Sequence, residues 1–530
     1  MYKNPGQTAL ADFIFPYGRL KEDNRWVKLA KLIPWADIER DYAAGFSPVG
    51  APAHPARMAL GALIAKQELH CSDRELVQHV AENPYLQYFL GLTEFTDECP
   101  FGASTLVAFR TRFTVEDVTR INDMIIARAS GRGADEDGED GGDRKDDGDD
   151  GKDGGCHDGD VGGGIDGRDP KDGVCTKADG ADEDTHELTM SLDATVAPSD
   201  IAYPQDMRLL DEARRYLEDA IDAICAETGV RKPRMYREVA RREFLTWSKS
   251  KKRGAKKTQR AIRKQLAYIK RDLRYYHDLA DHYAPDVAIY QMGMIETIET
   301  LFAQQSYMYE NKTHSVPDRI VSLSQPWVRP IVRGKAAANT EFGAKVHLST
   351  DDAGLARIEH LSFDAFNESE GLIGAVEGFY ERYGRWPDRI LADKIYRTRT
   401  NLAWCKERHI RLSGPKLGRP LKDVEATNEQ KATEQRDAAD RNVVEGVFGT
   451  TKRTYGLACV ATRLEHTTKT VIAISIMVFN LNKLLASSFG LLSGADVCLR
   501  INLTALSRFL SAVFRPVCPC ESITLAGLPA

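Results

Sequence analysis

Residues 440–453 read DRNVVEGVFGTTKR, and on a helix this stretch places one acid between two bases. At roughly 3.6 residues per turn, Arg441, Glu445 and Lys452 lie on one stripe of the helix surface. A carboxylate flanked by fixed cations suits a metal-assisted phosphoryl-transfer site, where a phosphate group also needs neutralising. A surface helix with an ordinary ion pair between Arg441 and Glu445 has the same spacing, so the interpretation depends on the rest of the chain.

Two further acids follow apolar runs that are typical of buried strands. The alternating run at 188–192 precedes Asp193, and the short run at 389–392 precedes Asp393. We expect both acids at the carboxyl ends of their strands, where catalytic groups usually collect in α/β sheets. A single Asp in such a place is more often a helix cap or a turn residue, but two of them together with Glu445 indicate a site.

The order of elements between these acids predicts an α/β fold. The expected elements are a strand at 319–323, a hairpin of strands at 342–348 and 355–363, a helix at 369–382, the strand before Asp393, a helix at 400–407, a strand at 410–413 and one long helix bearing Glu445. This is the order of a ribonuclease-H-like mixed sheet, in which two strand-borne Asp and one helix-borne Glu can converge on divalent metal ions.

Through these residues the chain resembles the DDE transposases of bacterial insertion sequences. The motifs that carry the resemblance are Leu192-Asp193-Ala194-Thr195, Ala392-Asp393-Lys394-Ile395-Tyr396 and Arg441-x3-Glu445-x6-Lys452, with further similar stretches at 326–335, 341–345 and 414–420. Many relatives carry Gly where this chain has Ile395, so we expect the turn after the second acid to differ.

The resemblance implies an enzyme that cuts and joins DNA at the terminal inverted repeats of a mobile element. Its partners would be the double-stranded DNA of those repeats and of the target, and a second copy of the chain on paired ends. Two alternatives stay open: a ribonuclease-H-like nuclease that cuts without strand transfer, and a DNA-binding protein whose catalytic site is relict. The implied roles are Mg²⁺ or Mn²⁺ binding and catalysis for Asp193, Asp393 and Glu445, phosphate contacts for Arg441 and Lys452, and a sugar or phosphate contact for Tyr396.

The N-terminal region, residues 1–130, is predicted to form a separate all-α domain. Helices are expected at 55–69, from the capping box at 72–75, at 84–90 and from Ser104. The tight junction at 69–72 suits a helix-turn-helix, although a generic helical bundle fits about equally well. The candidates for base contacts on the second helix of this unit are Arg74, Gln78 and His79.

A helical insertion is expected at about 205–315, after the first strand. Its residues 231–274 are dense in basic side chains interleaved with aromatic ones, a pattern that favours contact with a phosphate backbone over a simple solvated face. The main candidates for this contact are Lys251, Lys252, Arg253, Lys256 and Lys257.

Charge sets one segment apart from the rest of the chain. The whole chain has 72 Lys and Arg against 78 Asp and Glu, a net charge of −6. Residues 131–187 carry 21 acidic and 7 basic side chains, so the remainder has a net charge of +8, which suits a nucleic-acid-binding protein. This Gly- and Asp-rich segment lacks the apolar residues for a core, so we expect a disordered linker before a catalytic domain at 188–490.

The remaining features bear on location. Ten cysteines without a CxxC pair, and no secretory leader, indicate reduced thiols and a cytoplasmic protein. The resemblance to bacterial transposases implies association with the nucleoid. The apolar run at 471–479 is too short to span a membrane and predicts a buried core helix. A tail at 491–530 carries little readable pattern.

Overall fold

The computed structural model describes residues 9–16, 18–47, 52–130, 187–283, 285–332, 340–415 and 424–487, together with residues 6 and 49. The predicted acidic linker, except for its last residue, and the predicted C-terminal tail lie outside these residues. The ends of the motif stretches at 326–335 and 414–420 also lie outside them. The predictions made for these segments stay predictions.

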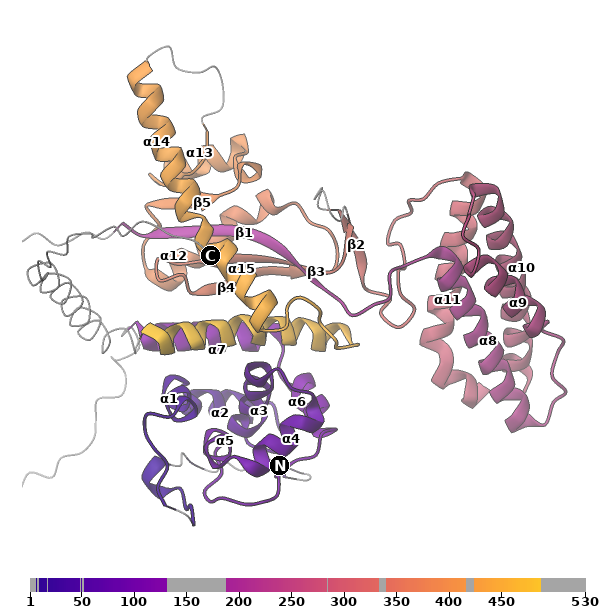
Figure 1. Cartoon of the computed structure of the whole chain (residues 1–530), viewed down its shortest axis with the longest axis horizontal. Helices are drawn as coiled ribbons and strands as arrows, with labels where there is room; N and C mark the ends of the chain where they lie inside the picture. Colours follow the sequence, from indigo (N-terminus) through magenta and orange to yellow (C-terminus); the bar gives the residue numbers. More distant parts are fainter. Residues whose placement is uncertain are drawn as a thin grey trace, which may run out of the picture.

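A mixed β-sheet forms the centre of the molecule (Figure 1). Its middle strand, β1 (Thr189–Pro198), pairs antiparallel with β3 (Thr340–Thr350) on one side and parallel with β5 (Arg389–Ala392) on the other. Apolar side chains from both faces of the sheet are buried against helices. The predicted α/β class is therefore confirmed as a mixed sheet with many helices.

Shorter strands complete the sheet. β2 (Arg329–Val332) and β4 (Ala356–Ser362) pair antiparallel with the outer side of β3, and β6 (Arg411–Leu412) pairs parallel with β5. β3 and β4 form the predicted hairpin, whose turn contains Gly354 at a φ of +67°. Glycine reaches this left-handed conformation without the strain that a side chain would add.

The prediction of a strand at 319–323 is wrong. This segment is irregular in the structure, although Ile320, Val321 and Leu323 are all buried. Ile320 and Leu323 belong to the core of the helical insertion, whereas Val321 belongs to a core on the sheet. The apolar pattern thus reflects burial in a connection between two cores, where no strand pairs with the segment.

Different helices cover the two faces of the sheet. α12 (Leu372–Tyr383) and α13 (Arg399–Glu407) contribute to a core on the face to which Leu192 points. α15 (Asn442–Thr454) and the helix at Glu465–Ser487 contribute to a core on the opposite face. Because successive side chains of β1 alternate between faces, Asp193 points to the face that carries α15.

The long helix predicted to bear Glu445 is two helices. α14 (Val424–Asp440) ends before Arg441, and α15 begins after it. Arg441 keeps helix-like angles, with φ of −61° and ψ of −21°. Arg441 and Glu445 therefore still lie one helical turn apart, as the spacing predicts.

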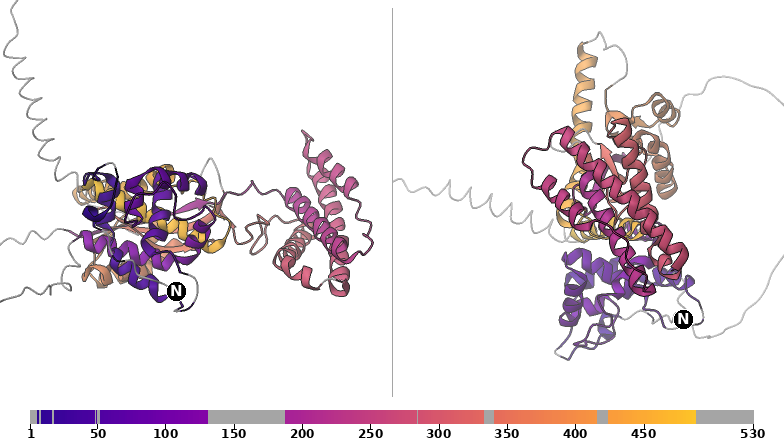
Figure 2. Two further views of the ribbon diagram at one scale, coloured as in Figure 1. Left: turned by 90° about the horizontal axis from the view of Figure 1, so that it is seen from below. Right: turned by 90° about the vertical axis from the view of Figure 1, so that its right-hand side faces the viewer.

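The expected helical insertion lies between β1 and β2 in the chain. It contains α8 (Asp206–Thr228), α9 (Arg237–Ser248), α10 (Ala255–Tyr283) and α11 (Pro285–Asn311). These helices form a bundle that stands apart from the sheet in the views of Figures 1 and 2. The bundle has an apolar core of its own, built largely from α8, α10 and α11.

Helices also fill the N-terminal region. Ser72 and Glu75 form the predicted capping box at the start of α4. The helices are α1 (Arg25–Leu32), α2 (Trp35–Ala44), α3 (Ala56–Leu69), α4 (Asp73–Glu82), α5 (Pro84–Phe89), α6 (Thr105–Arg112) and α7 (Val115–Ala129).

The predicted separation of this region from the rest of the chain is not confirmed. Its hydrophobic core includes Ala473, Met477 and Leu481 from the helix at Glu465–Ser487. In Figure 1 this helix and α7 run between the sheet and the other N-terminal helices. Ile472 and Ile476 of the same helix contribute to the core on the sheet. A helix that is apolar around its circumference can bury two faces at once, which joins the two regions.

The helix at Glu465–Ser487 is also longer than the predicted apolar run. By length and composition it could cross a membrane, but 61% of its most apolar window is buried inside the protein. A helix that is buried in two hydrophobic cores of a folded protein is equally long and apolar. The helix at Glu465–Ser487 is therefore only weak evidence for a membrane span.

Candidate active site

Asp393 follows the last residue of β5. Its carboxylate caps the 3-10 turn η3 (Lys394–Tyr396) by accepting a hydrogen bond from the backbone N–H of Lys394 at 2.7 Å. The side chain remains 53% exposed. Asp393 is therefore held by the backbone at the end of a buried strand and can still meet a ligand from solvent.

Glu445 lies in the first turn of α15, where buried Val444 and Val447 anchor the helix to the sheet. Its side chain is 55% exposed. The Arg441 guanidinium lies between the two acids, with Nη2 at 3.6 Å from Glu445 Oε1 and Nη1 at 3.3 Å from Asp393 Oδ1. Arg441 thus links an acid on β5 to an acid on α15.

Asp193 lies inside β1 rather than at its carboxyl end, because β1 continues to Pro198 in pairing with β3. The pairing between β1 and β5 ends at Leu192 and Ala392, so Asp193 and Asp393 occupy the next positions along the two adjacent stretches of chain. Asp193 accepts a hydrogen bond from the backbone N–H of Ala194 at 2.8 Å. α15 packs against β1 and β3, which brings the three predicted acids to one region of the sheet.

The three acids do not form a closed ligand set. Among the described residues, no three His, Cys, Asp or Glu side chains are grouped so that they could hold a metal ion. Carboxylate oxygens are nevertheless the hard donors that Mg²⁺ and Mn²⁺ prefer, and Asp393 and Glu445 are both accessible. The donor chemistry of this region, which we call the acid region, fits a divalent cation.

Lys452 lies in the last turn of α15, two turns beyond Glu445, and is partly buried. The apolar residue between them, Phe448, packs against the core on the sheet. The predicted stripe is therefore present on α15, and it runs from the acid region along the helix towards the N-terminal helices.

The predicted contact between Tyr396 and DNA is not met, because Tyr396 is completely buried. Its ring stacks on His347 of β3 at 5.7 Å between ring centroids, with 21° between the ring planes. In the motif around Asp393, the side chain of Tyr396 therefore lies in the core, whereas Lys394 and Ile395 are exposed. Sequence reasoning could not separate these outcomes, because the packing partner lies on another strand.

Sequence reasoning also missed a polar layer next to Tyr396. The Nζ atom of Lys345 lies 2.9 Å from Oε1 of Glu368 and donates a hydrogen bond to the Phe366 carbonyl oxygen. Burial, followed by the positive charges of His360 and Lys345, lowers the pKa of His347 to about 4. The alternation of residues 342–348 was the only signal that placed Lys345 and His347 on one face of a strand.

The predicted base-contacting residues lie on the surface of α4. Arg74, Gln78 and His79 are exposed, while Leu76 and Val80 face the core. The junction between α3 and α4 turns through His70, which has a left-handed φ of 51°. The described geometry is compatible with a helix-turn-helix whose second helix presents these residues outward.

The predicted phosphate-contacting residues lie where α9 meets α10. Their side chains are all exposed, and several also order the loop itself. Arg253 donates to the Ser248 carbonyl oxygen at 2.6 Å and lies 4.8 Å from the ring centre of Trp247. Lys257 donates to the Ser250 hydroxyl at 2.8 Å. These residues, Lys251, Lys252, Arg253, Lys256 and Lys257, form a basic tip on the bundle, away from the acid region (Figure 1).

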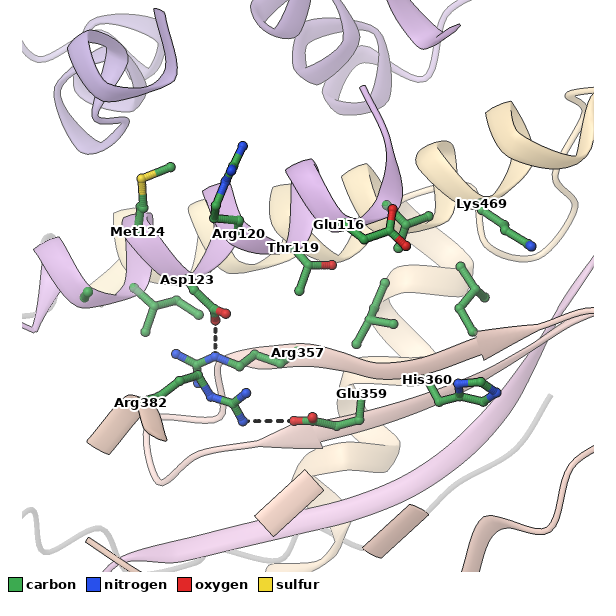
Figure 3. A pocket seen from close by; sticks show the side chains of 15 residues that line it. Glu116, Thr119, Arg120, Asp123, Met124, Arg357, Glu359, His360, Arg382 and Lys469 are labelled. Carbon is green, nitrogen blue, oxygen red and sulfur yellow. Dashed lines mark hydrogen bonds and ion pairs between the residues drawn. The ribbon is translucent and has the colours of Figure 1, made fainter. Parts of the chain in front are cut away.

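The groove between α7 and β4 has a volume of about 880 Å³ (Figure 3), and none of the three predicted acids lines it. Charged side chains meet across it in pairs: Arg357 with Asp123, and Arg382 with Glu359 at 3.0 Å. Burial raises the pKa of Glu359, although Arg382 and Ser349 oppose the shift. Asp123 and Glu359 are therefore committed to arginines, and Glu116 is the exposed acid among the residues that line the groove.

Comparisons with known proteins match two parts of the chain. Residues 390–482 match a family described as a transposase DDE domain, and residues 16–112 match one described as a transposase domain (DUF772). The first match includes Asp393, Arg441 and Glu445.

One curated relative is described as "Uncharacterized protein ORF8 in nfe locus" from Rhizobium meliloti. It is 40% identical over 86 residues, which are 16% of this chain and 42% of the relative. The chain therefore spans less than half the length of that relative. No solved structure matches.

Proposed function

The chain belongs to the DDE transposases of insertion sequences, and from this premise we propose that it cuts and joins DNA at the terminal inverted repeats of its own element. The observation that carries the proposal is the position of Arg441 between Asp393 and Glu445. These two acids come from different elements of the matched DDE domain, and Asp193 lies on the neighbouring strand.

The order of the strands supports a ribonuclease-H-like core. β3 runs antiparallel to β4 and to β1, whereas β1, β5 and β6 run parallel to one another, and the neighbours follow in the order β4, β3, β1, β5, β6. This arrangement brings one acid on the central strand next to one acid at the end of its parallel neighbour. A helix on the same face then supplies the third acid.

In the proposed site Asp193, Asp393 and Glu445 are the ligands of Mg²⁺ or Mn²⁺. Ions bound there would activate a water or a DNA 3′-hydroxyl and stabilise the leaving oxygen of an in-line displacement. The backbone N–H groups of Ala194 and Lys394 orient the two aspartates by binding Oδ1 of each carboxylate. Orientation by fixed donors reduces the reorganisation that the carboxylates need when they bind ligands.

Arg441 and Lys452 have positioning roles in this proposal. Arg441 holds the carboxylates of Asp393 and Glu445 near one another, and its guanidinium can also bind phosphate oxygens in a bidentate manner. Lys452 offers a second cation two turns along α15. The DNA backbone would then follow α15 across the acid region.

Two other surfaces are proposed to bind DNA. The exposed face of α4, with Arg74 and Gln78, would read the terminal inverted repeat. The basic tip of the bundle would contact phosphates of the repeat or of the target without reading sequence. Pairing of two ends would require a second copy of the chain, and the protein would act in the cytoplasm on chromosomal DNA.

The test uses the purified full chain and linear DNA that carries the sequences flanking its own reading frame. Cleavage is measured with Mg²⁺, with Mn²⁺ and with chelator, beside the Glu445→Gln variant. Metal-dependent cuts at defined ends, followed by joining to a second DNA, are the expected result. Cuts without joining would indicate the nuclease alternative. Binding without cutting in either metal would indicate a relict DNA-binding protein.

A further inference from the structure

The corner between α14 and α15 sets where Arg441 and Glu445 lie. α14 ends just before Arg441, and Glu445 follows in the first turn of α15, which Val444 and Val447 anchor to the sheet. The pairs of Arg441 with Asp393 and Glu445 are long, at 3.3 and 3.6 Å, and both acids are more than half exposed. Exposed pairs of this kind hold a corner only weakly, so the attachment of α14 matters for its position.

α14 is attached to the sheet by charge and not by an apolar face. None of its described side chains, at residues 428–440, belongs to a hydrophobic core, and Asp437 is the one among them that is buried. In Figure 1, α14 points away from the sheet, with its last turns near β5. A helix that is polar around its circumference needs polar contacts to hold it in place, and here the buried carboxylate of Asp437 provides them.

Two arginines from neighbouring strands hold the last turn of α14. Arg411 of β6 donates to both carboxylate oxygens of Asp437, at 2.6 Å to Oδ2 and at 2.9 Å to Oδ1. Arg389 of β5 pairs with Arg411 in the sheet register, and its Nη1 atom lies 2.8 Å from Oδ2 of Asp440. The Nε atom of Arg389 donates to the hydroxyl of Thr189 on β1 at 2.8 Å. We call the four charged residues, Arg389, Arg411, Asp437 and Asp440, the α14 clamp.

The α14 clamp lies on the same face of the sheet as the acid region. Side chains four residues apart on an extended chain share a face, so Arg389 and Asp393 point to the same side. Asp437, Arg441 and Glu445 follow one another at a spacing of one helical turn, and the backbone N–H of Arg441 donates to the Asp437 carbonyl oxygen at 3.0 Å. A displacement of Asp437 would therefore move Arg441 and Glu445 relative to Asp393.

We propose that Asp437 and Arg411 are positioning residues for metal binding and strand cleavage, because their paired hydrogen bonds hold the α14–α15 corner so that Arg441 and Glu445 face Asp393. The inference rests on the proposed function, because that function assigns Asp393 and Glu445 to metal binding. A bidentate pair between a guanidinium and a carboxylate fixes direction as well as distance. A misplacement of a reacting group by about 1 Å can lower a rate by about 100-fold, so a fixed corner has a direct effect on cleavage.

The test compares Asp437→Asn, Arg411→Gln and the double variant with Glu359→Gln, each in the full chain. Glu359 is the matched control, because it is a carboxylate on β4 that pairs with Arg382 of α12 at 3.0 Å, outside the acid region. The side chains of Asp437 and Glu359 are 6% and 11% exposed, so their burial is similar. The measurements are the affinity for Mn²⁺ alone by calorimetry, the Tm without metal, and the single-turnover cleavage rate of an element end at saturating Mn²⁺.

The α14 clamp variants should lose function beyond any loss of stability. Asp437→Asn and Arg411→Gln should each weaken Mn²⁺ binding about tenfold and lower the cleavage rate by about 10- to 100-fold. The double variant should lose no more than either single variant, because the two residues act through one contact. Arg411→Lys keeps the charge without the fork and should fall between wild type and Arg411→Gln. Glu359→Gln should lower the Tm and leave Mn²⁺ affinity and cleavage unchanged at temperatures where it is folded.

Three results would overturn the inference. The first is wild-type Mn²⁺ affinity and cleavage in Asp437→Asn at a temperature where this variant is folded. The second is a double variant whose loss is the product of the two single losses. The third is an equal loss of Mn²⁺ affinity in Glu359→Gln, since any broken ion pair would then have the same effect. If Asp437→Asn does not fold, the milder Arg411→Lys carries the same test, and wild-type values in it would overturn the inference.

Failure of the inference can be told apart from failure of the proposed function. If wild-type protein binds Mn²⁺ and cuts its element ends while Asp437→Asn does both equally well, only the inference is wrong. If wild-type protein neither binds Mn²⁺ nor cuts, the proposed function is wrong and the inference is wrong with it.

Discussion

The chain contains the same short motif, Arg followed four residues later by Glu, in two very different settings. In α8, Arg214 pairs with Glu218 at 2.5 Å and with Asp211 at 2.7 Å, and its side chain is 1% exposed. In the acid region, Arg441 pairs with Glu445 and Asp393, whose side chains are more than half exposed. The spacing is identical, so the difference between a structural network and a candidate site lies in burial and in the third partner.

Burial decides what each arginine can do. The carboxylates of Asp211 and Glu218 are buried and pair with Arg214, Arg215 and Arg237, so their charges contribute to the stability of the bundle. The carboxylates of Asp393 and Glu445 stay in contact with solvent, so a ligand can compete for them at low cost. An ion pair at a functional site is thus expected to be exposed and weak. In a buried structural pair, each charge needs an oppositely charged partner.

The largest expected effect comes from removing the charge of an acid in the acid region. Glu445→Gln should abolish strand cleavage while DNA binding survives, because the variant loses a metal ligand and keeps the helix. Asp193→Asn and Asp393→Asn should behave alike. Glu218→Gln is the matched control at the same spacing, and it should cut DNA normally at temperatures where it is folded. Loss of DNA binding together with cleavage would show that the three acids are structural.

The second prediction concerns the buried arginine. Arg214→Ala removes the closest cation from the buried carboxylates of Asp211 and Glu218, which keep only the longer pairs with Arg215 and Arg237, so the free energy of unfolding should fall by up to about 3–5 kcal/mol. Urea denaturation of the full chain, followed by circular dichroism, measures the change. The matched variant Arg441→Ala should change stability by less than about 1 kcal/mol, because its pairs are solvated. Equal losses of unfolding free energy in the two variants would show that the buried pairs of Arg214 and the exposed pairs of Arg441 contribute alike to stability.

The third prediction uses pH to test the buried network of the bundle. Burial raises the pKa of Asp272 from its ordinary value of 3.8 to about 6, despite a hydrogen bond from Arg271. The folded state therefore holds a proton that the unfolded chain releases, and the free energy of unfolding should fall as pH rises from about 4 to about 6.

The matching control is Asp272→Asn, which cannot titrate. The difference in stability between wild type and this variant should shift against the wild type by up to about 3 kcal/mol across that window, and level off above it. Thermal or urea unfolding at several pH values measures the difference. A difference that is constant with pH would mean that Asp272 is ionised in the folded bundle.

Much of the arrangement of the acid region was predictable from local patterns. The pair between Arg441 and Glu445 follows from helix geometry, and the position of Asp393 at the end of a strand follows from an apolar run that ends in an acid. The burial of Tyr396 was not predictable, since it depends on His347 on a strand that lies almost 50 residues earlier. Local periodicity carries no information on which residue another strand presents.

The wrong strand at 319–323 and the unconfirmed separation of the N-terminal region have the same origin. The run at 319–323 is apolar because two cores meet there, and a run of buried residues looks the same whether or not a strand pairs with it. The N-terminal region was expected to be separate because its helices have caps and apolar faces of their own. Its link to the sheet comes from the helix at Glu465–Ser487, more than 300 residues later, whose two buried faces belong to different cores.

The fourth prediction is smaller and concerns positioning. Arg441→Ala should lower the cleavage rate by roughly 100-fold without abolishing it, because a positioning contact contributes only a few kcal/mol to the transition state. Arg441→Lys should recover part of the rate, since it restores the charge but not the forked geometry. Single-turnover cleavage of an element end measures both. A full wild-type rate in Arg441→Ala would exclude Arg441 from the site.

The smallest effects are expected at the basic tip of the bundle, whose charged side chains are exposed. Lys251→Ala and Lys256→Ala should each weaken DNA binding modestly and equally for all sequences, and reduce the slope of log affinity against log salt by about 1. Lys406→Ala, an exposed lysine on α13, is the control and should leave the slope unchanged. A loss confined to one DNA sequence would mean that the tip reads bases. An unchanged slope would mean that Lys251 and Lys256 make no contact with DNA phosphates and that the basic tip is only a solvated surface.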